Sequence, residues 1–235
     1  MRALLQNIWK GALDYVFTKE CFNCGGEGEY LCSPCFNQVK FIDEFYCFLC
    51  NEKRSPLGIC PSCSSETGID RVIIATHYTN NVVGEMIEAF KYDYLESLAD
   101  ILFKILDKQI EKHNLSAQVY GRVFIPIPLH RKRLAERGFN QSEELVKRLA
   151  RRYGGEMRTD LLKRVKYTGQ QAKLRREERF ANMEGAFEVP LNANIPARVV
   201  LLDDVLTSGA TFIQAARALR TAGVREVVCV AVAHG

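Results

Sequence analysis

The sequence RVVLLDDVLTSGAT, at residues 198–211, combines an apolar strand, a pair of acids and a loop of small residues. Residues 199–202 form a continuous apolar run, which is typical of a central strand in a parallel sheet covered on both faces. Asp203 and Asp204 end that run, at the strand end where open α/β sheets bind ligands. We therefore expect both carboxylates to face solvent in their charged form.

The residues after the acid pair predict an anion-binding loop. Their small side chains leave backbone amides free just before an amphipathic helix, which is expected at residues 212–222 and is closed by Gly223. The loop residues are Thr207, Ser208, Gly209, Ala210 and Thr211. Acids can follow any strand and small polar residues commonly cap helices, but here strand, acids, loop and helix stand in the order that a phosphate site requires.

This arrangement resembles the diphosphate-sugar signature of type I phosphoribosyltransferases. In that family the acid pair holds the ribose 2′- and 3′-hydroxyls, and the loop that follows wraps the 5′-phosphate. The resemblance implies that Asp203 and Asp204 bind the ribose of phosphoribosyl pyrophosphate, with Mg²⁺ as the accompanying cation, and that the loop binds its phosphate.

Eight of the nine cysteines form four Cys-x-x-Cys pairs near the start of the chain. The pairs are Cys21 and Cys24, Cys32 and Cys35, Cys47 and Cys50, and Cys60 and Cys63. Two such pairs supply the four thiolates of a closed structural zinc site, so the sequence predicts two structural Zn²⁺ ions. A disulfide framework is the alternative, but it needs an oxidising compartment.

We expect each zinc site to use two consecutive pairs, because the loops between them are short and cost little entropy to close. That grouping gives one tetrad at Cys21, Cys24, Cys32 and Cys35 and another at Cys47, Cys50, Cys60 and Cys63. A crossed arrangement stays open from the sequence. The ninth cysteine, Cys229, lies in an apolar run at residues 226–233 and is expected to behave as a small buried hydrophobe.

The chain has 235 residues, of which 47% are hydrophobic, enough for one sizeable core and a small accessory module. We expect a zinc-binding module with an N-terminal helix at residues 1–66 and an α/β domain at residues 67–235. Residues 1–17 predict an amphipathic helix rather than a signal peptide, because polar residues interrupt every apolar run. No apolar stretch reaches the ~20 residues that span a bilayer, and we expect a cytoplasmic protein.

Strands and helices alternate along the second domain, which predicts a parallel α/β sheet. Strands are expected at residues 71–76, 122–127, 158–165, 186–189, 199–202 and 226–233. Helices are expected at residues 82–112, with a break near residues 92–94, at about residues 142–153, and at residues 212–222.

Two further loops are predicted to complete the anion site. The loop after the strand at residues 122–127 reaches the sheet edge of the acid pair, where its amides and positive charge suit a pyrophosphate group. Its residues are Leu129, His130 and Arg131, although His130 also fits a purely structural hydrogen-bonding role. The segment YTGQQAKLRREER, at residues 167–179, fits either a mobile flap or a solvated linker. The flap residues expected over the site are Gln170, Gln171 and Arg175.

Positive charge is concentrated at residues 131–179, which hold sixteen Lys or Arg against seven Asp or Glu, although the net charge of the chain is only +4. Such a segment suits a polyanion, either a pyrophosphate group or the backbone of a nucleic acid. A solvated basic helix face is the alternative.

Together these features resemble the ComF family. The resemblance rests on the cysteine knuckles, on IPIPLHRKRLAERGFNQSEEL at residues 125–145, on TGQQAKLRREERFANMEGAF at residues 168–187 and on LLDDVLTSGAT at residues 201–211. It implies a type I phosphoribosyltransferase-like sheet behind a double zinc ribbon. Members of this family are linked to natural competence, where they support the handling of incoming single-stranded DNA, and close relatives are amidophosphoribosyltransferase-like.

Three functions follow from this resemblance. The first is a protein that binds phosphoribosyl pyrophosphate with Mg²⁺ and acts in DNA uptake, contacting single-stranded DNA or a DNA-processing protein. The second is an active salvage phosphoribosyltransferase, and the third is a regulator that senses the metabolite. A salvage enzyme needs a hood that recognises a nucleobase, and the cysteine knuckles offer no obvious base-reading pocket. A sensor is expected to carry a DNA reader such as a helix-turn-helix, which the sequence does not show. The sequence therefore favours the first function and assigns no catalytic residue.

Overall fold

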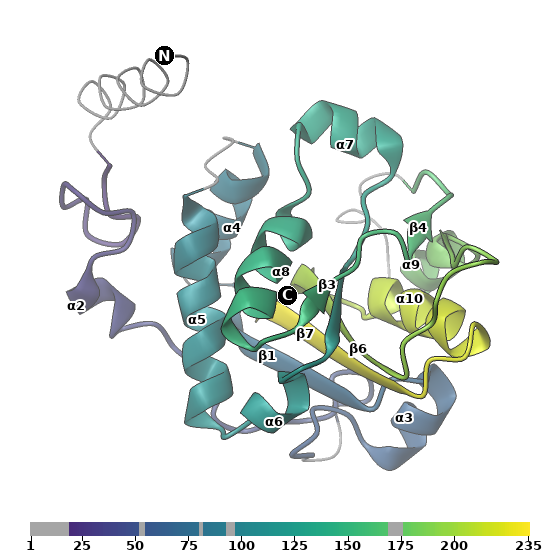
Figure 1. Cartoon of the computed structure of the whole chain (residues 1–235). Coiled ribbons are helices and arrows are strands. Elements are labelled where there is room, and N and C mark those ends of the chain that lie inside the picture. Colours follow the sequence, from purple (N-terminus) through teal and green to yellow (C-terminus); the bar gives the residue numbers. More distant parts are fainter. Residues whose placement is uncertain (1–18, 52–54, 80–81, 93–96, 169–175) are drawn as a thin grey trace. The chain divides into compact units, whose positions relative to one another are not determined.

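The computed structural model describes residues 19–51, 55–79, 82–92, 97–168 and 176–235 (Figure 1). The chain divides into two compact units, Met1–Lys40 and Phe41–Gly235. This division falls between the two cysteine tetrads. A zinc-binding module that ends after residue 66 stays a prediction.

The described residues of the first unit, 19–40, form tight turns around four cysteines. An antiparallel bridge joins Glu20 to Glu27, and the Cys21 N–H donates to the Gly26 carbonyl at 2.8 Å. Gly25 takes the left-handed backbone conformation, with φ 70°, that the knuckle turn requires. Helix α2 (Ser33–Phe36) has a proline in its first turn and carries the last cysteine of the tetrad.

The second unit contains a five-stranded parallel sheet. Its strands are β1 (Arg71–His77), β2 (Val123–Pro126), β3 (Glu156–Met157), β6 (Arg198–Leu206) and β7 (Glu226–His234). Their order in the sheet is β1-β7-β6-β2-β3 (Figure 1). The apolar residues of β6 and β7, Cys229 included, are buried, as the two apolar runs predict. The predicted α/β class with a parallel sheet is confirmed.

Helices cover both faces of this sheet. One face carries α4 (Val82–Tyr92), α5 (Leu98–Lys112) and α8 (Gln141–Arg152). The other carries α10 (Ala210–Thr221), which packs against α3 (Pro61–Thr67) and α9 (Arg176–Met183). Alternate residues of β6 enter the two layers, and Val199 and Leu201 join the hydrophobic cluster beneath α10. Within the part of the chain that the structure describes, no helix combines the length and apolar character needed to cross a bilayer.

The second cysteine tetrad belongs to the core of this α/β unit. Its segment follows the edge of β1, where Phe41 bridges Thr76 in antiparallel register and the Val72 N–H donates to the Leu57 carbonyl at 2.8 Å. Cys47, Cys60 and Cys63 are buried in the same hydrophobic cluster as α10, together with Phe48 and Ile59. This second ribbon, residues 41–67, therefore covers a sheet edge that would otherwise be open to another strand.

Several short elements differ from the sequence-based expectation. The predicted strand at residues 158–165 is wrong, because only Lys163–Arg164 forms a strand, β4. β4 pairs antiparallel with β5 (Phe187–Glu188) in a separate two-stranded sheet. The short helices α6 (Ser116–Val119) and α7 (Arg131–Arg137) were also not predicted. None of the α7 residues is buried, so the sequence shows no apolar periodicity there. α9 begins inside the segment that was expected to be a flap or linker.

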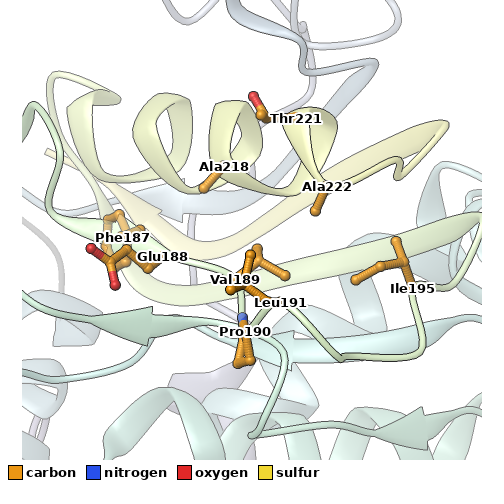
Figure 2. Close-up of a pocket in the computed structure, with 9 residues that line it drawn as sticks. All are labelled: Phe187, Glu188, Val189, Pro190, Leu191, Ile195, Ala218, Thr221 and Ala222. Atoms are coloured by element: carbon orange, nitrogen blue, oxygen red, sulfur yellow. The ribbon is translucent and has the colours of Figure 1, made fainter.

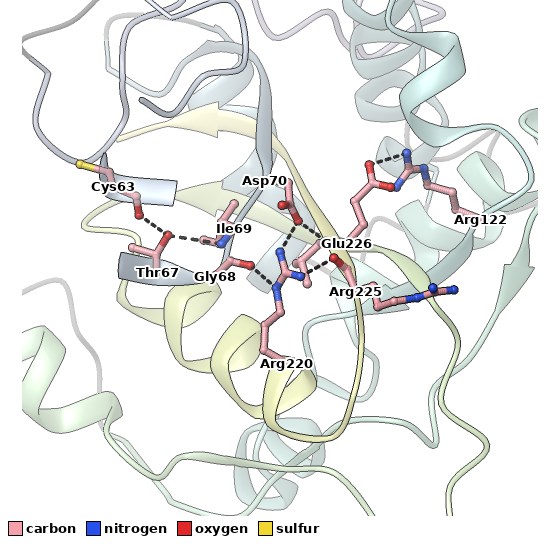
Figure 3. A network of polar contacts seen from close by, with 10 residues as sticks. Cys63, Thr67, Gly68, Ile69, Asp70, Arg122, Arg220, Arg225 and Glu226 are labelled. Atoms are coloured by element: carbon pink, nitrogen blue, oxygen red, sulfur yellow. Dashed lines mark hydrogen bonds and ion pairs between the residues drawn. The ribbon is translucent and has the colours of Figure 1, made fainter. Parts of the chain in front are cut away.

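A polar network at the amino edge of the sheet joins α3, α10 and β7 (Figure 3). Arg220 donates from Nε to the Gly68 carbonyl at 2.8 Å and pairs with Asp70. Asp70 also accepts the Val227 N–H at 2.7 Å. The carboxyl end of α10 is therefore fixed to the segment that follows α3.

Candidate functional site

The acid pair lies at the point where the strand order reverses. From β2 the chain continues to β3 in one direction along the sheet, and from β6 it continues to β7 in the other. The crevice between the carboxyl ends of β2 and β6 is the place where open α/β sheets bind ligands. Asp203 and Asp204 lie toward the carboxyl end of β6, beside Ile127 of the loop after β2, whose N–H donates to the Leu202 carbonyl at 2.9 Å.

Asp204 is buried and Asp203 is partly buried, which corrects the expectation that both carboxylates face solvent. Oδ1 of Asp203 accepts the Ser142 hydroxyl at 2.9 Å and the Asp204 N–H at 3.0 Å. Asp204 is 8% exposed, and its Oδ2 lies 3.2 Å from Nζ of Lys91. Burial, together with the neighbouring charge of Asp204, raises the pKa of Asp203 to about 7. Asp203 therefore gains or loses its proton near neutral pH.

We expect Asp203→Asn to stabilise the folded protein by roughly 2–4 kcal/mol at pH 8 and by less at pH 5. The pKa of Asp203 is about 7 in the folded protein and 3.8 for an ordinary aspartate, so the native state binds more protons between these values. Wild-type stability therefore falls as the pH rises through this interval, whereas the Asn variant stays neutral. Urea denaturation at both pH values measures the difference. An equal effect at pH 5 and pH 8 contradicts the raised pKa.

Lys91, on α4, contacts Asp204 directly and connects it to Glu88 and Tyr78. Burial lowers the pKa of Lys91, but the charges of Asp204 and Glu88 outweigh burial and raise it. Glu88 also accepts a hydrogen bond from the Tyr78 hydroxyl, and burial and this contact raise the pKa of Tyr78 to about 12. The Tyr78 N–H donates to the His234 carbonyl at 2.7 Å. The carboxyl ends of β1 and β7 are thus linked to the acid pair by residues that the sequence did not single out.

The predicted anion loop connects β6 to α10. Gly209 is the N-cap residue of α10 and has a φ of 81°, a conformation that other residues rarely adopt. The Ala210 N–H lies 3.4 Å from the Ser208 hydroxyl oxygen, and Thr207 is exposed. The first-turn N–H groups of a helix lack intrahelical partners, and such groups bind anions. The loop therefore brings an anion-binding helix terminus directly after the acid pair.

The loop after β2 leads into α7, with His130 at its N-cap. Nδ1 of His130 accepts the Lys132 N–H at 3.3 Å, which is the structural role that the sequence left open. Burial lowers the pKa of His130, and the charges of Arg131 and Lys132 lower it further, so the imidazole that accepts this bond is neutral. Leu129 is partly buried and Arg131 is exposed. These residues lie at the same sheet edge as the acid pair.

The segment RGFNQS, at residues 137–142, connects α7 to α8 beside the acid pair. Phe139 packs on Phe90 of α4, with ring centroids 5.4 Å apart. Asn140 caps α8 by accepting the Ser142 N–H at 3.1 Å and donates to the Ile127 carbonyl at 3.0 Å. Asn140 thus fixes the loop after β2 and places Ser142 against Asp203. The sequence predicted a helix start here but did not identify Ser142 as a site residue.

The eight paired cysteines form two tetrads in the sequential grouping, and the crossed arrangement is excluded. Within each tetrad, Cys21/Cys24/Cys32/Cys35 and Cys47/Cys50/Cys60/Cys63, the Sγ atoms lie within 4.8 Å of one another. Four thiolates around zinc at ~2.3 Å stand about 3.8 Å apart. The Cys21 and Cys24 Sγ atoms each lie 3.8 Å from that of Cys32, and the Cys50 and Cys60 Sγ atoms are 4.0 Å apart. Both tetrads therefore fit a closed structural Zn²⁺ site.

Backbone amides converge on one sulfur of each tetrad. Burial raises the pKa of the Cys21 thiol, but the N–H groups of Cys32 and of its own knuckle lower it to about 6. Burial likewise raises the pKa of Cys47, and N–H groups of its own knuckle and of Cys60 lower it to about 6. The thiolate is the form that binds metal. These N–H groups thus favour the thiolate at one cysteine of each tetrad, whereas burial and the neighbouring thiols raise the pKa of Cys35 and Cys63.

Two cations of the basic segment are paired with acids of a neighbouring helix. On α8, Arg148 pairs with Asp100 at 2.6 Å, and Arg152 pairs with Glu111 at 2.5 Å. Both acids lie on α5. These two cations therefore serve the contact between two helices, and they are less available to a polyanion than unpaired cations would be.

Two other cations of the basic segment lie at the start of α7. Arg131 and Lys132 are both exposed to solvent. Nζ of Lys132 lies 5.1 Å from the ring centroid of Tyr167, whose side chain is 46% exposed. Cations beside an exposed aromatic ring form the combination that single-stranded nucleic acids contact.

A groove of about 550 Å³ follows the carboxyl half of α10 (Figure 2). Its lining is mostly apolar and consists of Phe187, Glu188, Val189, Pro190, Leu191, Ile195, Ala218, Thr221 and Ala222. None of the site residues predicted from the sequence lines this groove, which lies at the other end of α10 from Gly209. The predicted flap residues, Gln170, Gln171 and Arg175, lie outside the described residues.

Several curated proteins are similar to this chain over most of its length. Competence protein F of Haemophilus influenzae is 30% identical over 223 residues, which cover 90% of this chain and 95% of that protein. Competence protein ComFC of Streptococcus pneumoniae is 28% identical over 200 residues, 84% of each chain. DNA utilization protein YhgH of Salmonella typhimurium is 25% identical over 215 residues, 84% of this chain and 93% of the relative. No protein-family model matches the chain.

Proposed function

The chain belongs to the ComF family, and from this premise we propose that it binds phosphoribosyl pyrophosphate with Mg²⁺ and supports the uptake or processing of single-stranded DNA in natural transformation. The names of its relatives associate them with competence and with DNA utilization. One observation carries the ligand proposal: the acid pair and the N-terminus of α10 stand together at the switch point of a parallel sheet. The proposed compartment is the cytoplasm.

Each part of the site receives one part of this ligand in the proposal. Asp203 and Asp204 accept hydrogen bonds from the two ribose hydroxyls, because both carboxylates lie at the carboxyl end of β6. The amides of residues 207–211 hold the 5′-phosphate at the helix terminus. The pyrophosphate lies toward the loop after β2, where Leu129, His130 and Arg131 offer backbone amides and one exposed positive charge.

Mg²⁺ enters the proposal as the cation that accompanies the pyrophosphate. It prefers carboxylate and phosphate oxygens, and it would neutralise charge on the leaving group. Asp204 already has Lys91 as its counter-ion, whereas Oδ1 of Asp203 accepts a hydroxyl and a backbone amide. Asp203 is therefore the carboxylate that we propose to face Mg²⁺, and its ionisation near pH 7 couples metal binding to pH.

Titration calorimetry with phosphoribosyl pyrophosphate, in the presence and absence of Mg²⁺, tests the ligand proposal. We expect saturable binding to one site, with higher affinity when Mg²⁺ is present. Absence of binding at millimolar ligand in Mg²⁺ contradicts the proposal.

An active phosphoribosyltransferase in nucleotide or base salvage is the second candidate. The place of Asp203 favours it: this carboxyl group lies toward the carboxyl end of β6 at the proposed ligand crevice, and a raised pKa suits it to accept a proton from an incoming nucleophile. Pyrophosphate release from phosphoribosyl pyrophosphate, measured with and without added nucleobases and amines, separates the two candidates. Release that depends on an acceptor supports the transferase, and binding without release supports the competence protein alone.

We propose that single-stranded DNA contacts the α7 surface, defined by Arg131, Lys132 and Tyr167. The two cations are exposed, and the exposed Tyr167 ring offers a face on which a base can stack. Stacking on one aromatic side chain contributes about 1–3 kcal/mol per base. If the chain does not contact DNA directly, a DNA-processing protein is the alternative partner.

Reversing the charge of the α7 surface, with Arg131→Glu and Lys132→Glu, is expected to weaken single-stranded DNA binding at least about tenfold and to flatten its salt dependence. Fewer phosphates are then neutralised, so fewer counterions are released. The matched control is Arg198→Glu with Arg225→Glu, two exposed cations at the amino edge of the sheet. Fluorescence anisotropy across a salt series measures both variants. Equal losses in the two variants, or no binding by the wild type at low salt, contradict direct contact through α7.

A further inference from the structure

The second ribbon touches the anion loop through one aromatic ring. Phe48 lies inside the knuckle Cys47-Phe48-Leu49-Cys50 and is 8% exposed. A β-carbon at Gly209 would stand 2.3 Å from Cε2 of Phe48 and 3.3 Å from its Cζ, so the ring lies directly against the glycine backbone. Gly209 combines this close approach with a φ of 81°. The Phe48 ring therefore fills the space that a side chain at residue 209 would occupy.

The end of the same ribbon and Gly68, which directly follows it, hold α10 at its other end. Thr67, the last residue of α3, donates its hydroxyl to the Cys63 carbonyl at 2.7 Å and accepts the Ile69 N–H at 3.3 Å (Figure 3). The next carbonyl along the chain, that of Gly68, accepts Nε of Arg220 at 2.8 Å. Both ends of α10 are thus fixed by segments that carry zinc-binding cysteines, Cys47 at the amino end and Cys63 at the carboxyl end.

We propose that Phe48 is a positioning residue for phosphate binding: its ring holds the loop at residues 207–211 in the shape that receives the 5′-phosphate. This inference rests on the proposed function, in which that loop binds the phosphate. The loop consists of small residues and has little side-chain packing of its own. A contact from outside the loop, such as that of Phe48, therefore lowers the entropy cost of ordering the loop when the ligand binds. The second knuckle provides that support, and it makes the second ribbon a part of the ligand site.

Phe48→Ala tests the proposal against a control that the chain supplies. The first knuckle, Cys21-Phe22-Asn23-Cys24, has a phenylalanine at the same position, and this Phe22 lies in the other compact unit, beside Tyr30. We expect Phe48→Ala to weaken ribose 5-phosphate and phosphoribosyl pyrophosphate about tenfold or more in calorimetry. Inorganic pyrophosphate, which depends on the loop after β2, should keep its affinity. Phe22→Ala should change none of the three, and Phe48→Leu, which restores apolar volume, should recover part of the loss.

General damage to the fold gives a different result. It would weaken pyrophosphate as much as ribose 5-phosphate, and that outcome overturns a positioning role. Equal affinities of Phe48→Ala and wild type for all three ligands overturn it as well.

A measurement without ligand separates this inference from the proposed function. Amide hydrogen exchange of residues 207–211 should be faster in Phe48→Ala than in Phe22→Ala, while the buried amides of β6 and β7 stay protected. Unchanged exchange in the loop overturns the inference, whatever the ligand results. If the loop exchanges faster but the wild type binds no phosphorylated ligand, the support by Phe48 stands and the proposed ligand is wrong.

Discussion

Replacing Asp203 and Asp204 together by Asn is expected to lower the affinity for phosphoribosyl pyrophosphate at least about 100-fold, because two charge-assisted hydrogen bonds contribute roughly 1.5–3 kcal/mol each. The fold should survive. Asn at residue 203 keeps the oxygen that accepts the Ser142 hydroxyl, and Lys91 keeps Glu88 as a counter-ion at 3.6 Å. Calorimetry measures the affinity, and circular dichroism reports the fold.

The control for the Asp203/Asp204 variant removes two negative charges from the surface of the protein. Asp43 and Asp160 are both exposed and form surface ion pairs with Lys112 and Arg158, which contribute little to stability. Asp43→Asn with Asp160→Asn should bind phosphoribosyl pyrophosphate as the wild type does. Undiminished affinity in the Asp203/Asp204 variant, or collapse of its circular dichroism spectrum, would refute the assignment of the acid pair to the ligand.

The sequence predicts the central strand, the acid pair, the anion loop and the helix after it, because these stand next to one another in the chain. It does not predict Lys91 as the partner of Asp204, because that contact forms only when α4 packs on the sheet. α4 was expected as part of a helix at residues 82–112, and a single lysine in it indicates no partner. The sequence identifies neither Lys91 nor Ser142 as a partner, so the carboxylates were expected to face solvent. Tertiary packing instead buries Asp204, partly buries Asp203 and raises the pKa of Asp203.

The regular spacing of the cysteines suggested one module, but the two ribbons differ in composition. The loops of the first tetrad are polar and rich in glycine, as in Asn23 and residues 25–29. Those of the second contain Phe48, Leu49, Leu57 and Ile59, and Ile59 is fully buried. Apolar residues between metal ligands indicate that the ribbon packs against another part of the protein. This difference was visible in the sequence, yet only the fold shows that α10 and the edge of β1 are what the second ribbon covers.

Cys24→Ser and Cys50→Ser are expected to have very different effects, although each cysteine closes a Cys-Phe-x-Cys knuckle. We expect about two zinc ions per wild-type chain and about one in each variant, measured by elemental analysis. A structural zinc contributes about 10–16 kcal/mol of apparent binding free energy to folding, comparable with the ~5–15 kcal/mol stability of a whole domain. Loss of the second zinc should therefore unfold much of the α/β unit, whose core includes three of these cysteines.

Loss of the first zinc should leave the α/β unit folded, because the first tetrad lies in the separate unit Met1–Lys40. Circular dichroism of Cys24→Ser should retain the signal of the sheet and its helices, and amide exchange should rise only in residues 19–40. In Cys50→Ser exchange should rise in α3, which belongs to the second ribbon, and in β1 and α10, which the ribbon contacts. A folded α/β unit in Cys50→Ser that lacks one zinc contradicts the integration of the second site into the core. Less than one zinc in folded and reduced wild-type protein rules out the double zinc site.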